Sequence, residues 1–165
     1  MTLLNNSVIK RLGIFCFYDK NGHAARFLDG FLAALTQNLT DLVIIVNGKI
    51  DDETRKLFSK YTDTVMVREN KGLDVAAYKQ ALLTIGWEKL ETYDEVLCLN
   101  DTIMGPVYPF DEMFETMSHR DVDFWGITAY AGETVNGEKI PTHLQAYWHA
   151  YRRDMVSSQA FHEYW

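Results

Sequence analysis

A carboxylate follows directly on an apolar segment near the middle of the chain. Residues 95–99 read Glu-Val-Leu-Cys-Leu, and Asn100, Asp101 and Thr102 come next. In open α/β sheets, ligands bind in the crevice beyond the carboxyl ends of the strands, so an acid at this position can face a ligand or a metal ion. Asp101 is therefore the first candidate functional residue. The alternative is structural, because Asn and Asp both begin turns by bonding their own backbone.

A second segment has the composition of a ligand-binding loop. Residues 68–79 read Arg-Glu-Asn-Lys-Gly-Leu-Asp-Val-Ala-Ala-Tyr-Lys. Gly72 permits a tight turn, a helix N-terminus after it offers free amide groups, and Arg68, Lys71 or Lys79 can balance phosphate charge. The alternative is an ordinary strand-to-helix turn in which Asp74 serves the helix dipole. The G-x-G-x-x-G and G-x-x-x-x-G-K-S/T patterns of dinucleotide and P-loop sites do not occur.

The histidines and cysteines lack the spacing of a structural metal site. The five histidines show no H-E-x-x-H or closely paired pattern. Cys16 and Cys98 lie in apolar, strand-like runs, which is typical of buried core thiols. His143 differs because it follows Pro141 and Thr142 at the start of a predicted strand, where a loop residue can reach the same crevice as Asp101. The absence of G-x-S-x-G disfavours a serine hydrolase.

The segments that must position these residues alternate between strand and helix. Apolar runs at 12–18, 42–46, 64–67 and 95–100 predict strands. Apolar residues at helical spacing between positions 27 and 35 predict an amphipathic helix of about four turns. A short helix capped by Asp51 or Asp52 follows the second strand, and another helix follows the third. This alternation predicts an α/β fold of Rossmann-like type, with three α/β/α layers and a mainly parallel central sheet.

The C-terminal third extends the pattern less regularly. Pro109 can begin a helix with an apolar stripe, and the runs 122–128 and 144–151 predict two more strands, separated by a polar loop. Ser157 is expected to cap a final helix whose apolar face continues to Trp165. We therefore expect residues 1–165 to be a single domain that is truncated at its C-terminus.

Composition limits the classes of function. The 165 residues are 47% hydrophobic, enough for one domain with a core, and the formal charge of −7 disfavours binding to the nucleic-acid backbone. No apolar run approaches the ~18 residues of a membrane span. Residues 1–6 have neither the basic start nor the apolar stretch of a signal peptide. These features predict a cytoplasmic protein.

Four segments together resemble the rhamnan synthesis protein F family, a group of glycosyltransferase-like domains used in cell-wall and surface polysaccharide assembly. These segments are Glu69–Lys79, Tyr93–Thr102 with Gly105 and Pro106, Asp123–Gly126 and His143–Tyr147. More distantly, an Asn-x-Gly helix start followed by a strand that ends in an acid is similar to nucleotide-sugar transferases of the GT-A fold. Each motif is unspecific alone, but the combination is specific and covers nearly the whole chain.

The resemblance implies a nucleotide-sugar site in which a divalent cation, Mg²⁺ or Mn²⁺, neutralises the leaving diphosphate. Asp101 would be the carboxylate on the metal side. The residues expected to bind the nucleotide-sugar are Asn70, Lys71, Gly72, Asp74, Asn100 and His143. GT-A enzymes commonly show Asp-x-Asp where this chain has Asn100, Asp101 and Thr102, so one metal-binding carboxylate is missing from the pattern.

An inverting transferase also needs a general base for the acceptor hydroxyl. The candidates are Asp123 and Glu133, each of which has the alternative of facing solvent or capping an element. The implied donor is a dTDP- or UDP-sugar, with rhamnose among the candidate sugars. The implied acceptor is a polysaccharide or a lipid-linked glycan, handled at the inner face of the membrane in contact with membrane assembly machinery.

Two other functions compete with the transferase. The first is a non-catalytic domain that binds a glycan or an assembly partner and keeps only the fold, which the missing carboxylate favours. The second is a Rossmann-like enzyme that acts on another phosphorylated small molecule, which the lack of a glycine-rich phosphate loop disfavours. Fold-level likeness does not decide between them.

Overall fold

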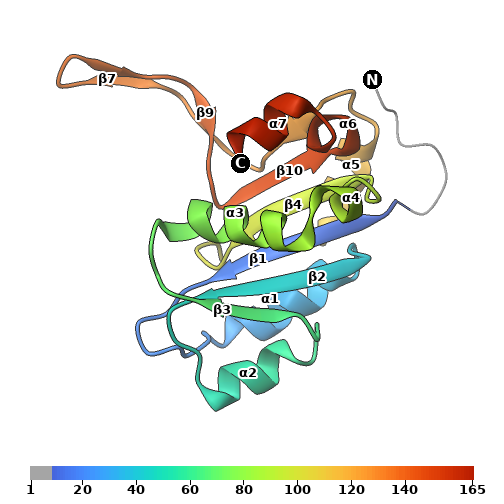
Figure 1. Ribbon diagram of the computed structural model, residues 1–165, viewed down its shortest axis with the longest axis vertical. Helices are drawn as coiled ribbons and strands as arrows, with labels where there is room; N and C mark the ends of the chain where they lie inside the picture. Colours follow the sequence, from blue (N-terminus) through green and yellow to red (C-terminus); the bar gives the residue numbers. More distant parts are fainter. Residues whose placement is uncertain (1–8) are drawn as a thin grey trace.

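The computed structural model describes residues 9–165, so the segment 1–6 considered above lies outside the described residues. Its centre is a six-stranded sheet in the order β3-β2-β1-β4-β10-β5 (Figure 1). The bounds are β1 Arg11–Phe17, β2 Asp41–Asn47, β3 Val65–Arg68, β4 Glu95–Asn100, β5 Phe124–Trp125 and β10 Trp148–Arg152. Strands β1 to β4 are parallel, and β10 runs antiparallel to both β4 and β5. The predicted mainly parallel sheet is confirmed.

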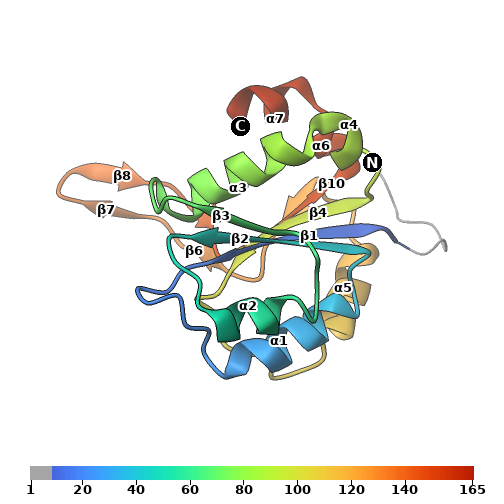
Figure 2. The same ribbon diagram turned by 60° about the horizontal axis from the view of Figure 1, so that its bottom comes forward.

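Helices cover both faces of this sheet, which gives the expected three layers (Figure 2). On one face lie α1 Phe27–Thr36, α2 Asp52–Phe58 and α5 Phe110–Ser118. On the other lie α3 Leu73–Ile85, α4 Trp87–Leu90, α6 Arg153–Val156 and α7 Gln159–Tyr164. Within residues 9–165, none of the helices has the length and apolar character needed to cross a bilayer.

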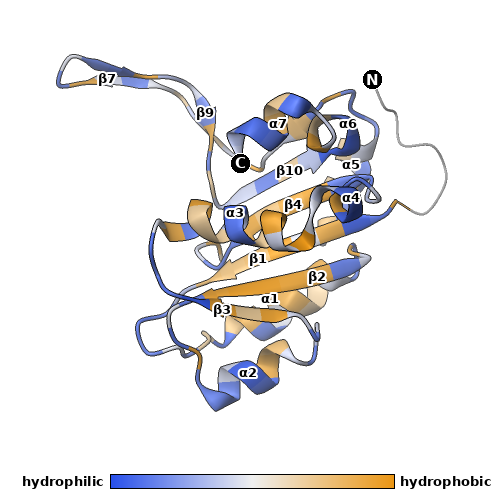
Figure 3. Cartoon of the chain, viewed as in Figure 1, coloured by the Kyte–Doolittle hydropathy of each residue, from blue (hydrophilic) through white to orange (hydrophobic). Residues whose placement is uncertain are grey.

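Side-chain alternation along the buried strands builds two separate cores. In β1, Ile14 and Cys16 join the core under α3, whereas Phe15 and Phe17 join the core under α1. Figure 3 shows the central strands as the most hydrophobic part of the chain. Cys16 and Cys98 are buried free thiols on the neighbouring strands β1 and β4, as their apolar surroundings predicted.

The predicted strands over 122–128 and 144–151 are wrong in extent. Only β5 and β10 join the main sheet, while β6 Ala129–Tyr130 pairs with β9 His143–Leu144 in a separate ribbon. The break falls at Gly126, where a Cβ atom would lie 2.7 Å from the Trp148 carbonyl oxygen. The two segments approach so closely there that a side chain at position 126 would clash with the backbone.

The predicted polar loop is a β-hairpin. Strand β7 Glu133–Val135 pairs with β8 Glu138–Ile140, and the turn residues Asn136 and Gly137 have φ of 51° and 85°. Two successive positive φ angles make this a type I′ turn, for which Asn-Gly is the preferred sequence. Figure 1 shows the hairpin projecting from the body of the molecule on the side where α3 begins.

Helix ends also differ from the predictions in detail. Ser158, not Ser157, caps α7 by accepting from the Phe161 N–H at 3.2 Å, because Ser157 already ends α6. Helix α1 has ten residues, about three turns rather than four. The predicted cap Asp51 is confirmed, since its side chain accepts from the Thr54 N–H at 2.7 Å.

A buried charge cluster at the amino end of β4 joins this strand to β1, β5 and β10. Glu95 is 1% exposed and accepts from Arg11 Nε at 2.9 Å and from Trp125 Nε1 at 2.7 Å. Arg152 Nε lies 3.3 Å from the same carboxylate, and its Nη2 donates to the Met117 carbonyl at 2.5 Å. Burial lowers the pKa of Arg152. One carboxylate therefore compensates two buried guanidinium groups.

Replacing Glu95 with Ala should destabilise the fold by about 3–5 kcal/mol, because two buried arginines lose their counter-charge. Chemical denaturation measures the change in the free energy of unfolding. Glu115→Ala is the matched control, since Glu115 is exposed and pairs with the exposed His119; its effect should stay within about 0.5 kcal/mol. Equal effects of the two substitutions would contradict this account of the cluster.

Candidate functional site at the carboxyl edge of the sheet

The carboxyl ends of β1 and β4 meet at the point where the strand order reverses. Strand β1 has β2 on one side and β4 on the other, and such a switch point is where open α/β sheets bind ligands. Strand β4 ends at Asn100, so Asp101 stands directly beyond it. The Tyr18 N–H, just past β1, donates to Asp101 Oδ2 at 3.4 Å. The Asp101 carboxylate thus bridges the two strand ends.

The environment of Asp101 disfavours its charged form. Burial raises the pKa of Asp101 to about 6, the N–H of Tyr18 opposes this rise, and the charge of Asp19 adds to it. A carboxylate in such a place gains from a cation, because an opposite charge favours ionisation. Asp101 is therefore suited to hold a cation or to exchange a proton near neutral pH.

Asn100 connects the two segments that the sequence singled out. Its Nδ2 donates to Asp74 Oδ2 at 3.0 Å, so the start of α3 is tied to the end of β4. Its Oδ1 accepts from the Thr102 N–H at 3.1 Å and from Thr102 Oγ1 at 2.6 Å. Asn100 therefore also forms the turn that was the structural alternative for this segment.

Asn47 and Arg68 complete this edge. Asn47, the last residue of β2, is 2% exposed; its Nδ2 donates to the Leu73 carbonyl at 3.0 Å and its Oδ1 accepts from Arg68 Nη1 at 2.6 Å. Gly72 and Leu73 have φ of 74° and 57°, a conformation that costs a non-glycine residue energy. The Asn47 amide fixes the carbonyl of that strained turn.

Asn47 is not among the site residues predicted from the sequence, although its position carries a signal. Asn47 ends an apolar strand in the same way as Asn100 does, with a polar side chain at the carboxyl edge. Arg68 was expected to balance phosphate charge, but its guanidinium is engaged within the protein. Its Nε donates to Gln80 Oε1 at 2.9 Å and its Nη2 to the Lys71 carbonyl at 2.8 Å. Arg68 therefore holds the loop in place.

The remaining predicted loop residues face solvent. Lys71 is exposed and its Nζ lies 3.0 Å from Glu69 Oε1. Asn70 is exposed and borders Gly48, since a Cβ at Gly48 would lie 3.8 Å from the Asn70 Cβ. The loop thus presents Lys71 and Asn70 to solvent.

Three predicted residues are not brought to Asp101. Asp123 precedes β5 at the opposite, amino edge, where its carbonyl accepts from the Arg152 N–H at 2.8 Å. Glu133 lies on the projecting hairpin, and its carboxylate contacts the Tyr130 hydroxyl. His143 stacks on Tyr130, with ring centroids 5.1 Å apart, and lines a different cavity beside α7.

The residues present fit a divalent cation that takes one carboxylate from the protein and its other ligands from a bound substrate and water. Across residues 9–165, no group of three or more His, Cys, Asp or Glu side chains is arranged to hold a metal ion. The two carboxylates of this edge have different partners: Asp74 accepts from Asn100 Nδ2, and Asp101 accepts from the Tyr18 N–H. Mg²⁺ commonly takes one or two carboxylates and completes its shell with water and substrate phosphates. Asp101 can serve as that one carboxylate.

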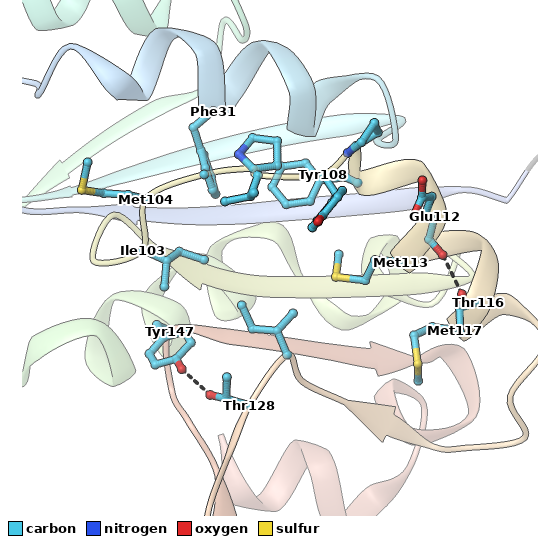
Figure 4. Close-up of a pocket in the computed structure, with 16 residues that line it drawn as sticks. Phe31, Ile103, Met104, Tyr108, Glu112, Met113, Thr116, Met117, Thr128 and Tyr147 are labelled. Atoms are coloured by element: carbon cyan, nitrogen blue, oxygen red, sulfur yellow. Dashed lines mark hydrogen bonds between the residues drawn. The ribbon is translucent and has the colours of Figure 1, made fainter.

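A groove of about 640 Å³ opens beside the loop that follows Asp101 (Figure 4). Its walls come from this loop and from α5, and Tyr147 and Thr128 lie at its other side with their hydroxyls in contact. Ile103 lines it only two residues after Asp101. The groove is therefore lined by the loop that begins directly after Asp101.

The rhamnan synthesis protein F family model matches residues 42–165. The chain belongs to this family. The match includes Asn47, Arg68, Asp74, Asn100 and Asp101, that is, the carboxyl ends of β2, β3 and β4. The family resemblance inferred from the sequence motifs is thus confirmed, and with it a connection to rhamnan synthesis, a polysaccharide biosynthesis.

A protein of Sinorhizobium fredii (strain NBRC 101917 / NGR234), described as "Uncharacterized protein y4gN", is 24% identical over 126 residues. The alignment covers 75% of this chain and 31% of that relative. The chain thus spans about a third of the length of this curated relative.

Asn47→Ala should free the strained loop, because Arg68 Nη1 and the Leu73 carbonyl lose their partner. We expect a loss of about 1–3 kcal/mol in unfolding free energy and faster amide hydrogen exchange confined to residues 69–76. Asn38→Ala is the control, since the Asn38 amide bonds Asp111 at the surface. Unchanged exchange in the loop would contradict the role of Asn47.

Asp101→Asn should alter the pH dependence of stability. The pKa of Asp101 is about 6 in the folded protein and about 4 in an unfolded chain, so the folded state holds the proton more tightly. The carboxyl therefore contributes stability at low pH that is lost as pH rises from about 4 to about 6. Without divalent cations, the wild type should lose roughly 1–3 kcal/mol more than Asp101→Asn between pH 4 and 7. Parallel stability curves for the two proteins would contradict the assignment.

Proposed function

We propose that this domain transfers a sugar from a nucleotide-sugar donor to a growing polysaccharide, with the nucleotide diphosphate bound at the carboxyl edge of the sheet. The observation that carries the proposal is the Asp101 carboxylate bridging β1 and β4 at the switch point, tied through its neighbour Asn100 to Asp74. Membership of the rhamnan synthesis family supports a polysaccharide as the product. The donor classes proposed are dTDP- and UDP-sugars.

In this proposal Asp101 holds a divalent cation against the diphosphate. Cleavage of the sugar–phosphate bond builds negative charge on the leaving diphosphate, and Mg²⁺ or Mn²⁺ when bound supplies positive charge there. Lys71, exposed on the rim, is free to swing from Glu69 to a phosphate. The α3 N-terminus begins at the same edge, where Asn47 holds the Leu73 carbonyl, and a helix N-terminus favours a bound anion.

Asp123 and Glu133 have no part in the proposed donor site, because one lies at the other edge and the other on the hairpin. The acceptor proposed is a polysaccharide or lipid-linked glycan. The proposed location is the cytoplasm at the inner face of the membrane, beside the assembly machinery. We also propose that the fold is of the GT-A type found in nucleotide-sugar transferases.

A second candidate function is a non-catalytic domain that binds a glycan or an assembly partner. The observation that favours it is Asn100, which replaces a carboxylate before Asp101 and is occupied by Asp74 and Thr102. Such a domain would keep the edge as a framework without a cation. The two candidates differ in whether nucleotide binding depends on Asp101 and on a divalent cation.

Calorimetric titration with UDP, dTDP and their sugars, with and without Mn²⁺ or Mg²⁺, tests the transferase. We expect cation-dependent binding that weakens at least tenfold in Asp101→Asn. Asp123→Asn is the matched control, since Asp123 is an exposed carboxylate at the opposite edge, and it should leave binding unchanged. The absence of any nucleotide response under all these conditions would reject the transferase and favour the binding domain.

A further inference from the structure

The loop between β4 and α5 exposes apolar side chains to solvent next to the candidate site. Met104 is 77% exposed, Val107 88% and Tyr108 75%. The segment from Thr102 to Phe110 contains no charged residue. Large apolar side chains gathered on one loop are typical of a surface that binds an apolar ligand or partner.

The groove beside this loop is lined mostly by apolar side chains. Met113 and Met117 of α5 line it together with Ile103 and Ile127. Figure 4 shows the labelled side chains of Met113, Met117 and Ile103 around one hollow. Methionine side chains are flexible and polarisable, which suits them to a chain-like ligand of variable conformation.

The charges of the groove exclude an anionic occupant. The only ionisable carboxylate among the lining residues is Glu112, and no Lys, Arg or His lines it. A phosphate or an acidic peptide would meet no cation and would face Glu112. A cavity of about 640 Å³ lies within the range of small-molecule sites, about 300–1,000 Å³. Charge and size together favour an uncharged, apolar small-molecule segment over a protein.

The groove begins at the proposed donor site. Asn100 N–H donates to the Tyr147 carbonyl at 3.3 Å, and the Tyr147 side chain forms part of the groove. The loop that forms its outer wall continues from Asp101 without interruption. The groove is therefore lined by Ile103, two residues after Asp101, and by Met113 and Met117 of α5.

We propose that this groove binds the uncharged apolar chain of an amphiphilic sugar acceptor, with the acceptor's sugar placed toward Asp101. The inference rests on the proposed transfer reaction for the identity of the ligand as an acceptor, but the groove binds the apolar chain without nucleotide. Recognition is by methylene burial against Ile103, Met113 and Met117, with the exposed side chains of the loop closing over the chain.

A homologous series of alkyl glucosides from methyl to octyl, each kept below its critical micelle concentration, provides the probe. Affinity for the intact chain, measured by calorimetry or by chemical-shift changes at the methionine methyl groups, should rise with length. Each buried methylene is worth about fourfold in affinity, until the groove is full. Affinity that is independent of chain length would overturn the proposal.

Val107→Asp places a charge on the outer wall, and because Val107 is almost fully exposed the substitution should leave the fold intact. We expect it to weaken octyl glucoside binding at least tenfold and to leave methyl glucoside binding unchanged. Val135→Asp on the projecting hairpin, also an exposed valine, is the matched control and should have no effect. Equal effects of the two substitutions would overturn the assignment to this groove.

Nucleotide binding separates this inference from the proposed function. If Val107→Asp loses the long-chain ligand and keeps cation-dependent UDP or dTDP binding, both proposals are supported. If the wild type binds the long-chain ligand but no nucleotide, the groove is supported and the transferase fails. If light scattering shows that the groove is closed by a second copy and that octyl glucoside does not dissociate it, the groove proposal fails.

Discussion

The buried amide of Asn47 is the contact on which the carboxyl edge of the sheet depends. A parallel strand that ends in the interior leaves its neighbours without a backbone partner at that point, and a short neutral side chain can satisfy them without introducing charge. Asn47 contacts two elements at once, since its side chain accepts from the Arg68 guanidinium of β3 and donates to the Leu73 carbonyl at the start of α3. The position of Asp74, and through it the contact with Asn100, follows from that one side chain.

The two ends of the sheet are stabilised by opposite means. At the amino end, Glu95 is surrounded by Arg11 and Arg152, so its charge is compensated where water is excluded. At the carboxyl end, neutral amides make most of the contacts, and the hydrogen bond that Asp101 accepts from the Tyr18 N–H is long. The raised pKa of Asp101 is the result of this contrast, because its burial is not matched by a cation of the protein.

Sequence patterns predicted the elements whose burial is complete and missed those that depend on single contacts. Strands such as β1, β2 and β4 are apolar between their terminal residues, so their extent was evident. The C-terminal region was harder because the bend at Gly126 comes from the approach of the Trp148 carbonyl, which is distant in the sequence. The hairpin turn has the Asn136-Gly137 sequence that type I′ turns prefer, yet the segment was predicted to be a polar loop.

Only part of the candidate site could be predicted from the sequence. The place of Asp101 beyond a strand and its proximity to the 70–74 turn follow from the rule for parallel sheets. The role of Arg68 could not be predicted, because the sequence around a loop arginine is the same whether its guanidinium binds a phosphate or the protein's own backbone. The separation of Asp123 from Asp101 required the strand directions, which reverse at β10.

The β7–β8 hairpin has a consequence for how such a domain can diversify. Its strands pair only with each other, and their six residues add nothing to either core. The length and composition of this arm can therefore change without a cost in folding, while the β2, β3 and β4 ends that build the edge cannot. An arm with that freedom, anchored on the side where α3 begins, is the part of the fold best able to acquire new contacts with different glycans or proteins.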